Sequence, residues 1–376
     1  MRDLNRIKGC LVGGAVGDAL GYAVEFSTLS EIIRKFGESG IKRYELDGGL
    51  ARISDDTQMA LFTANALLFG ETRGQMRGIG AGPAGYFTEA YLDWYETQTE
   101  KYPLRDYHSS WLVNFREFFS RRAPGGTCMS ALQAGGRGTV ERPVNNSKGC
   151  GGVMRVAPIG VYFAGKAHWE QEKVDMAGAK AAAVTHGHEL GYIPSAALVH
   201  IVCQLASAEK PDVFAAVLSS MEAMPKLFPE AGFMRYYLDL MDKAIDLSQK
   251  DVDDRNAIRQ LGEGWVAEET LAIAVYCAIK HADSFEDAIV ASVNHDGDSD
   301  STGAVTGNIL GTALGYTSIP DHYLEKLELR DIIEEISEDL YNDCQMSEYS
   351  DYRDPVWESK YIYVNYDKKK RAQLRK

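Results

Sequence analysis

Paired cysteines are absent from this 376-residue sequence. Its six cysteines stand singly along the chain, and no CxxC pair occurs that could form a zinc knuckle or a redox couple. Single, scattered cysteines are typical of proteins that work in a reducing compartment. We therefore expect a cytoplasmic protein.

Long apolar runs are missing as well. The stretch closest in length to a membrane span, residues 10–26, is rich in glycine and interrupted by Asp18 and Glu25. It falls short of the about 20 lipid-compatible residues that a span needs. The N-terminus places an acid inside its basic stretch, and no cleavage site follows that would be typical of a secretory signal. The sequence therefore predicts no membrane as a partner and no secretion signal.

Basic residues are too few for a uniformly basic surface. The chain has 40 Lys and Arg against 54 Asp and Glu, which gives a net charge of −14, whereas phosphate contacts need clustered cations. The only dense basic run is 368–371, which we expect to be a solvated, frayed end. Nucleic acid is therefore not expected as a partner of this acidic, globular chain.

Strand-like alternation is scarce, and helical periodicity dominates. One short run, 361–364, alternates as a strand would. We predict an all-α fold, with a compact arrangement of many helices. The most clearly periodic helical segments are 56–69, 177–183, 195–206, 267–279 and 332–340.

No linker with a change in composition divides the chain, so we predict a single domain over residues 1–376. Its motif-bearing core spans about 5–320, followed by a helical, Tyr-rich extension to about 366 and the basic tail 367–376. Two glycine-rich stretches, 70–85 and 124–152, are expected to be functional loops.

Glycine recurs at every fourth residue in two places, at 9–21 and at 303–315. Each helix would then carry a smooth stripe on one face. A glycine inside a helix costs about 1 kcal/mol relative to alanine, so the stripes imply a packing gain that offsets this cost. We predict two central helices whose backbones approach closely.

Two clusters of acids and hydroxyls open predicted helices. Residues 54–59 read SDDTQM, and residues 294–302 read NHDGDSDST, with Gly297 supplying a tight turn. Either cluster alone could be a plain helix N-cap. Two adjacent carboxylates at one cap exceed what capping requires, and neither cluster has the EF-hand spacing. Together they predict a site for one or two Mg²⁺ or Mn²⁺ ions, assembled from distant segments.

Five short motifs occur in a fixed order over most of the chain: Gly17-Asp18-Ala19-Leu20-Gly21 with Glu25, Ser54-Asp55-Asp56-Thr57, Gly149-Cys150-Gly151-Gly152-Val153-Met154-Arg155, Thr185-His186, and Gly297-Asp298-Ser299-Asp300-Ser301. With this set the sequence resembles the ADP-ribosylglycohydrolases, the relatives of dinitrogenase reductase-activating glycohydrolase, over roughly residues 7–315. The resemblance implies an all-α, mainly orthogonal helical fold with a binuclear Mg²⁺ or Mn²⁺ centre in a cleft that accepts ADP-ribose.

The resemblance also assigns site residues. It implies that the two metal ions are held by Ser54, Asp55, Asp56, Asp298, Asp300 and Ser301. It places around the diphosphate and the distal ribose the residues Gly149, Cys150, Gly151, Gly152 and Met154, with His186 as a further substrate contact. Asp56 and Glu25 are the two candidates for taking the proton of the attacking water. His188 is expected to be structural, and His295 and Asp296 to orient the metal cluster.

The implied reaction is hydrolysis at the anomeric carbon that links ADP-ribose to an acceptor. We expect ADP-ribosyl-arginine on a protein as substrate, with free ADP-ribose as product. Serine, small-molecule and nucleic-acid acceptors are alternatives, as is a non-catalytic ADP-ribose-binding protein. No phosphate-binding loop or Rossmann fingerprint supports an unrelated phosphohydrolase. The aromatics of 102–122, Trp111, Phe115, Phe118 and Phe119, are either core or a wall of the acceptor cleft.

Overall fold

The computed structural model describes residues 2–78 and 85–374, and the regular secondary structure in this part of the chain is helical, with three isolated β-bridges and no strand. The prediction of an all-α fold is confirmed. The α-helices are α1 (Leu4–Tyr22), α2 (Leu29–Phe36), α3 (Asp55–Arg77), α4 (Phe87–Thr99), α5 (Gly126–Gln133), α6 (Ala157–Phe163), α7 (Gln171–Ala183), α8 (Glu189–Ser207), α9 (Val213–Leu227), α10 (Met234–Ser248), α11 (Asp254–Leu261), α12 (Ala267–Lys280), α13 (Phe285–Val293), α14 (Ser299–Leu314), α15 (Asp321–Leu324), α16 (Arg330–Asn342), α17 (Pro355–Tyr361) and α18 (Lys368–Leu374). Short 3₁₀ helices are η1 (Trp111–Asn114), η2 (Arg116–Phe118), η3 (Cys150–Arg155) and η4 (Tyr316–Ser318).

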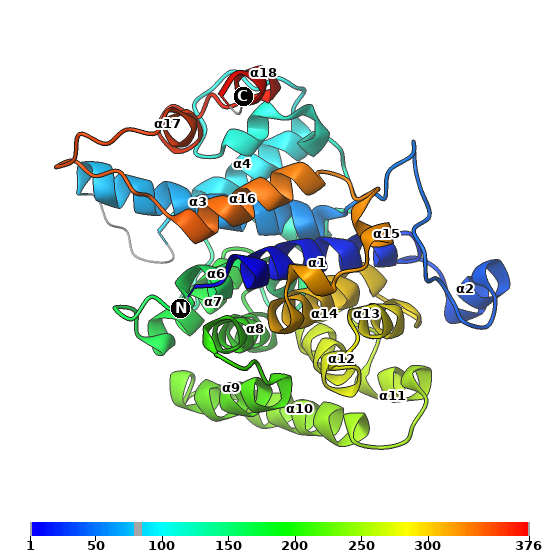
Figure 1. Ribbon diagram of the computed structural model, residues 1–376. Helices are drawn as coiled ribbons and strands as arrows, with labels where there is room; N and C mark the ends of the chain where they lie inside the picture. Colours follow the sequence, from blue (N-terminus) through cyan, green and yellow to red (C-terminus); the bar gives the residue numbers. More distant parts are fainter. Residues whose placement is uncertain (1, 79–84, 375–376) are drawn as a thin grey trace.

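The two glycine-striped helices, α1 and α14, cross antiparallel in the middle of the molecule (Figure 1). Gly9 faces Gly311, Gly13 faces Gly307 and Gly17 faces Gly303. A Cβ atom at Gly13 would lie 2.6 Å from the carbonyl oxygen of Gly307, which is closer than Cβ atoms approach non-bonded atoms in proteins. The prediction of two central helices in close backbone contact is therefore confirmed.

The remaining helices lie on two sides of α1 in the view of Figure 1, with α3, α4 and α16 to α18 above it and α8 to α14 below it. One connected hydrophobic core includes Ile7 near the start of α1 and Tyr366 near the end of the described chain. Among the described helices, α8 is the one long and apolar enough to cross a membrane by length and composition. Since 89% of its apolar window is buried inside the protein, α8 serves as a core helix.

The glycine-rich stretches are only partly loops. Helix α3 continues through 70–77 and ends at Gly78, which adopts the left-handed conformation that glycine tolerates, while residues 79–84 lie outside the described residues. The stretch 124–152 contains α5 and the start of η3. The aromatics Trp111, Phe115 and Phe118 are buried, which confirms the core interpretation for these three side chains.

At the C-terminal end, the expectation of a frayed basic tail was wrong, and the run that alternates as a strand would is not a strand. Residues 361–364 do not form a strand, because Asp354 caps α17 by accepting hydrogen bonds from the amides of Val356 and Trp357, and α17 runs to Tyr361. The basic run 368–371 is not frayed, because it forms α18 and meets acids of other elements. Arg371 pairs with Glu335 and Asp331 of α16, and Lys368 pairs with Glu117.

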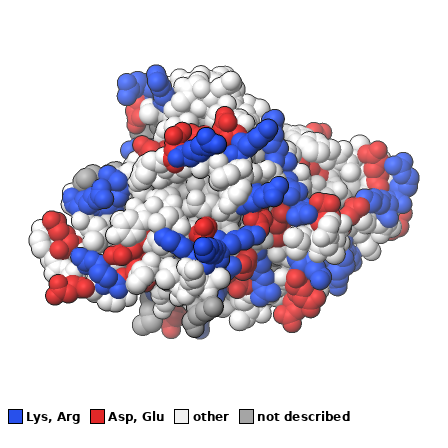
Figure 2. Space-filling view, turned by 90° about the horizontal axis from the view of Figure 1, so that it is seen from above, with Lys and Arg blue, Asp and Glu red and all other residues white. Residues whose placement is uncertain are grey.

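Figure 2 views the face that carries α17 and α18 from above, and basic and acidic side chains alternate over it. The basic tail therefore does not build an uninterrupted positive patch on this face.

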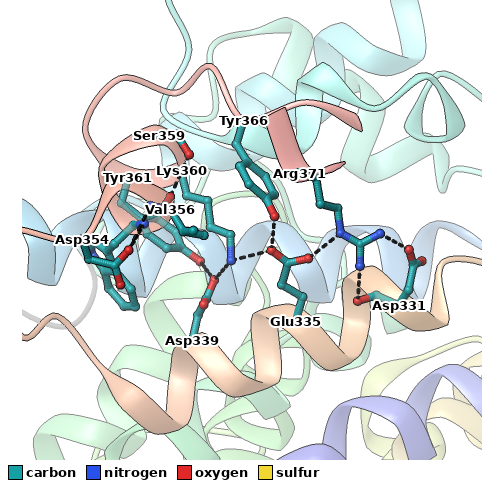
Figure 3. A network of polar contacts seen from close by, with 11 residues as sticks. Asp331, Glu335, Asp339, Asp354, Val356, Ser359, Lys360, Tyr361, Tyr366 and Arg371 are labelled. Carbon is teal, nitrogen blue, oxygen red and sulfur yellow. Dashed lines mark hydrogen bonds and ion pairs between the residues drawn. The ribbon is translucent and has the colours of Figure 1, made fainter. Parts of the chain in front are cut away.

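A buried network of ion pairs and hydrogen bonds joins the C-terminal end of the chain, from α17 onward, to α16 (Figure 3). The ammonium of Lys360 is fully buried and lies 2.8 Å from Oε1 of Glu335 and 2.6 Å from Oδ2 of Asp339. The hydroxyl of Tyr361 donates to Asp339 at 2.7 Å, and that of Tyr366 donates to Glu335 at 2.7 Å. Every partner of the ammonium is thus itself held, so the network ties α17 and the chain that follows it to α16.

Replacing Lys360 with methionine is expected to destabilise the protein by about 3 to 5 kcal/mol, because two buried carboxylates lose their shared cation. Urea unfolding followed by circular dichroism measures the change. The matched control is Lys368→Met, an exposed lysine whose ion pair with Glu117 is worth at most about 1 kcal/mol. Equal, small effects of both substitutions would contradict the structural role assigned to the buried network.

Candidate functional site

Three helix ends bring the predicted metal ligands together. Ser54 caps α3, and Asp55 and Asp56 are its first residues, while Asp298 caps α14. Because α1 runs antiparallel to α14, the C-terminal end of α1, followed by Glu25, lies beside the start of α14. The two acid clusters, 243 residues apart in the chain from Asp55 to Asp298, therefore face one another across the end of α1.

Asp18 fixes the start of α3 against α1. Its carboxylate accepts hydrogen bonds from the amide of Ser54 at 2.9 Å, from the amide of Thr57 at 3.1 Å, and from the hydroxyl of Thr57. Asp18 belongs to the first of the five motifs, but the sequence alone does not predict its role. The sequence signal for Asp18 is a charged residue inside an otherwise apolar, glycine-striped helix. Its carboxylate can be buried there only if another segment supplies hydrogen-bond donors.

Capping accounts for part of each cluster. The Ser54 hydroxyl accepts from the amide of Asp56 at 3.2 Å, and Oδ1 of Asp298 accepts from the amide of Ser301 at 3.3 Å. The turn before α14 requires Gly297, whose φ of 124° is rarely adopted by other residues. The interpretation as N-caps is thus correct for Ser54 and Asp298, but it leaves Asp55, Asp56 and Asp300 unexplained.

These carboxylates are buried and repel one another. Burial first, and then the charge of Asp300, raise the pKa of Asp55, of Asp56 and of Asp298 well above the usual range. The same two causes raise the pKa of Glu25 to about 10. A cluster of this kind needs a compensating positive charge.

Two oxygens in the cluster have no hydrogen-bond partner in the part of the chain that the structure describes. Oδ2 of Asp56 and Oε2 of Glu25 are buried and unpaired, although buried polar atoms nearly always find a partner. Carboxylate and hydroxyl oxygens are the ligands that Mg²⁺ and Mn²⁺ prefer, so the donor set fits the predicted ions. In residues 2–78 and 85–374, no three His, Cys, Asp or Glu side chains converge closely enough to enclose a metal, and the binuclear centre stays a prediction.

The glycine loop, residues 149–155, lies beside the acid cluster. Residues 150–155 coil into η3, and the amide of Cys150 donates to the carbonyl of Trp265 at 3.2 Å. Burial, and then the charges of Asp298 and Asp56, raise the pKa of the Cys150 thiol well above its usual value. The thiol is therefore neutral and lies beside the acid cluster, which places the loop against the predicted ligands.

His186 packs against this loop through glycines. A Cβ atom at Gly151 would lie 2.9 Å from Cε1 of His186, and one at Gly149 would lie 3.3 Å from its Nε2. Larger residues at these two positions would push the ring away. Gly152 and Met154 are buried on the same turn, and Met154 lines a small cavity of about 10 Å³ together with Asp56. The structure thus brings the predicted substrate contacts to one side of the acid cluster.

His188, His295 and Asp296, the other polar residues singled out in the sequence, form hydrogen bonds that support neighbouring helices. Nδ1 of His188 accepts from the amide of Leu190 at 3.0 Å and caps α8, which confirms its structural role. Nε2 of His295 lies 3.0 Å from the hydroxyl of Thr302 in the first turn of α14, as expected for an orienting residue. Asp296 instead accepts from the amide of Leu29 at 2.8 Å and so supports α2.

A cavity of about 1000 Å³ opens beside Glu25. The rings of Phe26 and Trp265 stack at its wall, with their centroids 6.3 Å apart. Groups of both charges line it, and no motif predicted a role for these side chains: Lys148, Arg255, Arg259, Glu263 and Glu269. The volume suits a nucleotide-sized ligand.

Buried carboxylates with raised pKa values at helix ends, beside a cavity of about 1000 Å³, are the combination by which an enzyme active site is recognised. Residues 1–350 match the family model described as ADP-ribosylglycohydrolase, and the chain belongs to this family of hydrolases. The resemblance inferred from the motifs is thereby confirmed.

Several relatives match nearly the whole chain. An uncharacterized protein of Archaeoglobus fulgidus is 29% identical over 89% of this chain and 96% of its own length. ADP-ribosylhydrolase ARH3 of Bos taurus is 26% identical over 92% and 95%, and ADP-ribosylarginine hydrolase Tri1 of Pseudomonas putida is 25% identical over 90% and 78%. A solved structure titled "ADP-ribosylglycohydrolase-related protein complex" shares the fold, with a TM-score of 0.55 and 22% identity over 90% of this chain and 98% of that chain.

Proposed function

We propose that this protein is a metal-dependent hydrolase that releases ADP-ribose from a modified acceptor, with ADP-ribosyl-arginine on a protein as its substrate, and so reverses mono-ADP-ribosylation. The observation that carries the proposal is the pair of unpartnered buried oxygens, on Asp56 and Glu25, inside a carboxylate cluster beside the cavity. The names of the relatives ARH3 and Tri1 support ADP-ribose removal, and that of Tri1 supports arginine as the acceptor.

The charges of the cavity support a substrate with both signs. Arg255 and Arg259 line one part of it and are chemical partners for a diphosphate. Glu263 lines it as well and is a partner for a guanidinium acceptor. ADP-ribosyl-arginine carries both groups. The six cysteines are all free thiols, which supports a cytoplasmic location.

The residues can be given roles in the reaction. Ser54, Asp55, Asp56, Asp298, Asp300 and Ser301 would hold two Mg²⁺ or Mn²⁺ ions. When bound, such ions orient the sugar hydroxyls and lower the pKa of water. Gly149 to Gly152 would lie around the diphosphate, with the backbone amides of Gly151 and Gly152 as donors to it. Asp56 or Glu25 takes the proton from the attacking water as the acceptor leaves.

The proposal is tested by measuring free ADP-ribose released from arginine-, serine- and cysteine-modified peptides, with Mg²⁺, with Mn²⁺ and with a chelator. We expect release from the arginine-modified peptide that requires a metal ion. Release from another acceptor would replace arginine in the proposal. Measurable ADP-ribose binding without any release would favour the non-catalytic binding protein.

Glu25 and Asp56 are expected to separate into two roles. Asp56→Asn should lose metal affinity and turnover together, because Asp56 is both a predicted ligand and a candidate base. Glu25→Gln should keep its metal affinity and lose about 100-fold or more in turnover, as expected for a missing proton acceptor. Calorimetric Mn²⁺ titration beside the peptide assay distinguishes them, and an equal loss of metal affinity in both variants would refute this division.

A further inference from the structure

Arg155, at the end of η3, is a fully buried arginine that has no acid as its partner among the described residues. Its Nη2 donates to the carbonyl oxygen of Ala181 and to the hydroxyl oxygen of Thr185, each at 2.8 Å. The guanidinium carbon lies 4.2 Å from the centre of the Tyr91 ring. Burying this charge without a carboxylate is costly. We therefore asked which function the hydrogen bonds of Arg155 serve.

The guanidinium fixes the direction of the Thr185 hydroxyl. Arginine can only donate hydrogen bonds, so the hydroxyl oxygen must accept from Arg155 and turn its hydrogen elsewhere. Two nitrogen or oxygen acceptors lie in reach, Nδ1 of His186 at 2.8 Å and the carbonyl oxygen of Ala182 at 3.5 Å, and the hydroxyl also contacts the thiol of Cys128, a weak acceptor. The shorter contact is the better hydrogen bond, so Thr185 donates to Nδ1 of His186.

An imidazole that accepts at Nδ1 carries its hydrogen at Nε2. Burial first, and then the charge of Arg155, lower the pKa of His186 to about 3, so the ring stays neutral. Its Nε2 faces the glycine loop at Gly149. Within residues 2–78 and 85–374, no protein group accepts a hydrogen bond from this nitrogen.

We propose that Arg155 and Thr185 are positioning residues that hold His186 in the Nε2–H tautomer, so that His186 donates a neutral hydrogen bond to an oxygen of ADP-ribose at the glycine loop. This inference rests on the proposed function for the identity of the ligand. The tautomer itself follows from the protein alone. A neutral donor orients an oxygen without adding a positive charge beside a sugar carbon that itself becomes positive.

The tautomer is measured by long-range ¹H–¹⁵N correlation spectra of the full chain with ¹⁵N-labelled histidine at neutral pH. In the unchanged protein we expect the His186 signals of an Nε2–H ring. Thr185→Val keeps the shape of the side chain and removes the hydroxyl, so we expect a mixture of tautomers and about 10-fold weaker binding of ADP-ribose, measured by calorimetry. Thr185→Ser is the matched control, since it keeps the hydroxyl and should keep the Nε2–H signals.

An Nδ1–H ring in the unchanged protein would overturn the inference, and so would an unchanged tautomer in Thr185→Val. If Thr185→Val does not fold, the spectrum of the unchanged protein and that of Thr185→Ser still decide the question. Failure of the peptide assay would remove the proposed hydrolase reaction, but the spectra would still report whether Arg155 and Thr185 set the ring.

Discussion

Replacing both Asp298 and Asp300 with alanine is expected to lower metal-dependent release of ADP-ribose by more than about 100-fold, because loss of residues that merely support ligands already costs about 10- to 100-fold. Both carboxylates belong to the start of α14 and lie among the buried acids of α3. The peptide assay with Mg²⁺ and Mn²⁺ measures turnover. Thermal unfolding with and without each metal measures binding, because a bound ion stabilises the folded state.

The matched control is the double variant Glu286→Ala and Asp287→Ala, which removes two acids from the first turn of α13. These side chains do not line the cavity, so turnover and the metal-induced rise in Tm should stay as they were. If the Asp298→Ala and Asp300→Ala variant still gained stability from Mn²⁺, the assignment of these two residues as ligands would be refuted.

Parts of the fold could be predicted from the sequence where a residue pattern has only one physical explanation. Four glycines at helical spacing near residue 13 and four near residue 309 have no use except close helix contact, and α1 and α14 meet in that way. The basic tail offered no such constraint. Whether Arg371 stays in water or binds depends on Glu335 and Asp331, which another helix supplies, and local charge patterning contains no information about that contact.

The candidate site likewise contains residues that the sequence predicts and residues that only the tertiary structure reveals. The acids of 54–56 and 298–301 stand out because each cluster holds more charge than its own helix start needs. Thr185 and Arg155 belong to two of the five motifs, but their roles could not be predicted, since these roles exist only when η3 lies against the end of α7. The cavity wall is similar: Phe26 and Trp265 are single aromatic residues 239 positions apart, and only the tertiary fold stacks them.

At the crossing of α1 and α14, the same close backbone contacts determine both the stability of the protein and the geometry of the candidate site. The substitution Gly307→Ala tests this dependence. In an isolated helix this change would stabilise by about 1 kcal/mol. Here the new Cβ atom would overlap the carbonyl oxygen of Gly13, and a backbone atom in a packed helix pair cannot move aside. We therefore expect the opposite sign, a loss of about 3 kcal/mol or more, measured by urea unfolding.

Gly126→Ala is the control, because Gly126 begins α5 and a Cβ atom there meets nothing within 4 Å; its effect should stay within about 0.5 kcal/mol. Any Gly307→Ala protein that folds must hold α1 and α14 farther apart. Since Asp18 of α1 holds the start of α3, where Ser54 to Asp56 lie, and Asp298 begins α14, we expect its metal affinity to fall as well. Stability and metal affinity equal to those of the unchanged protein would mean that the close crossing does not set the distance between the two halves of the site.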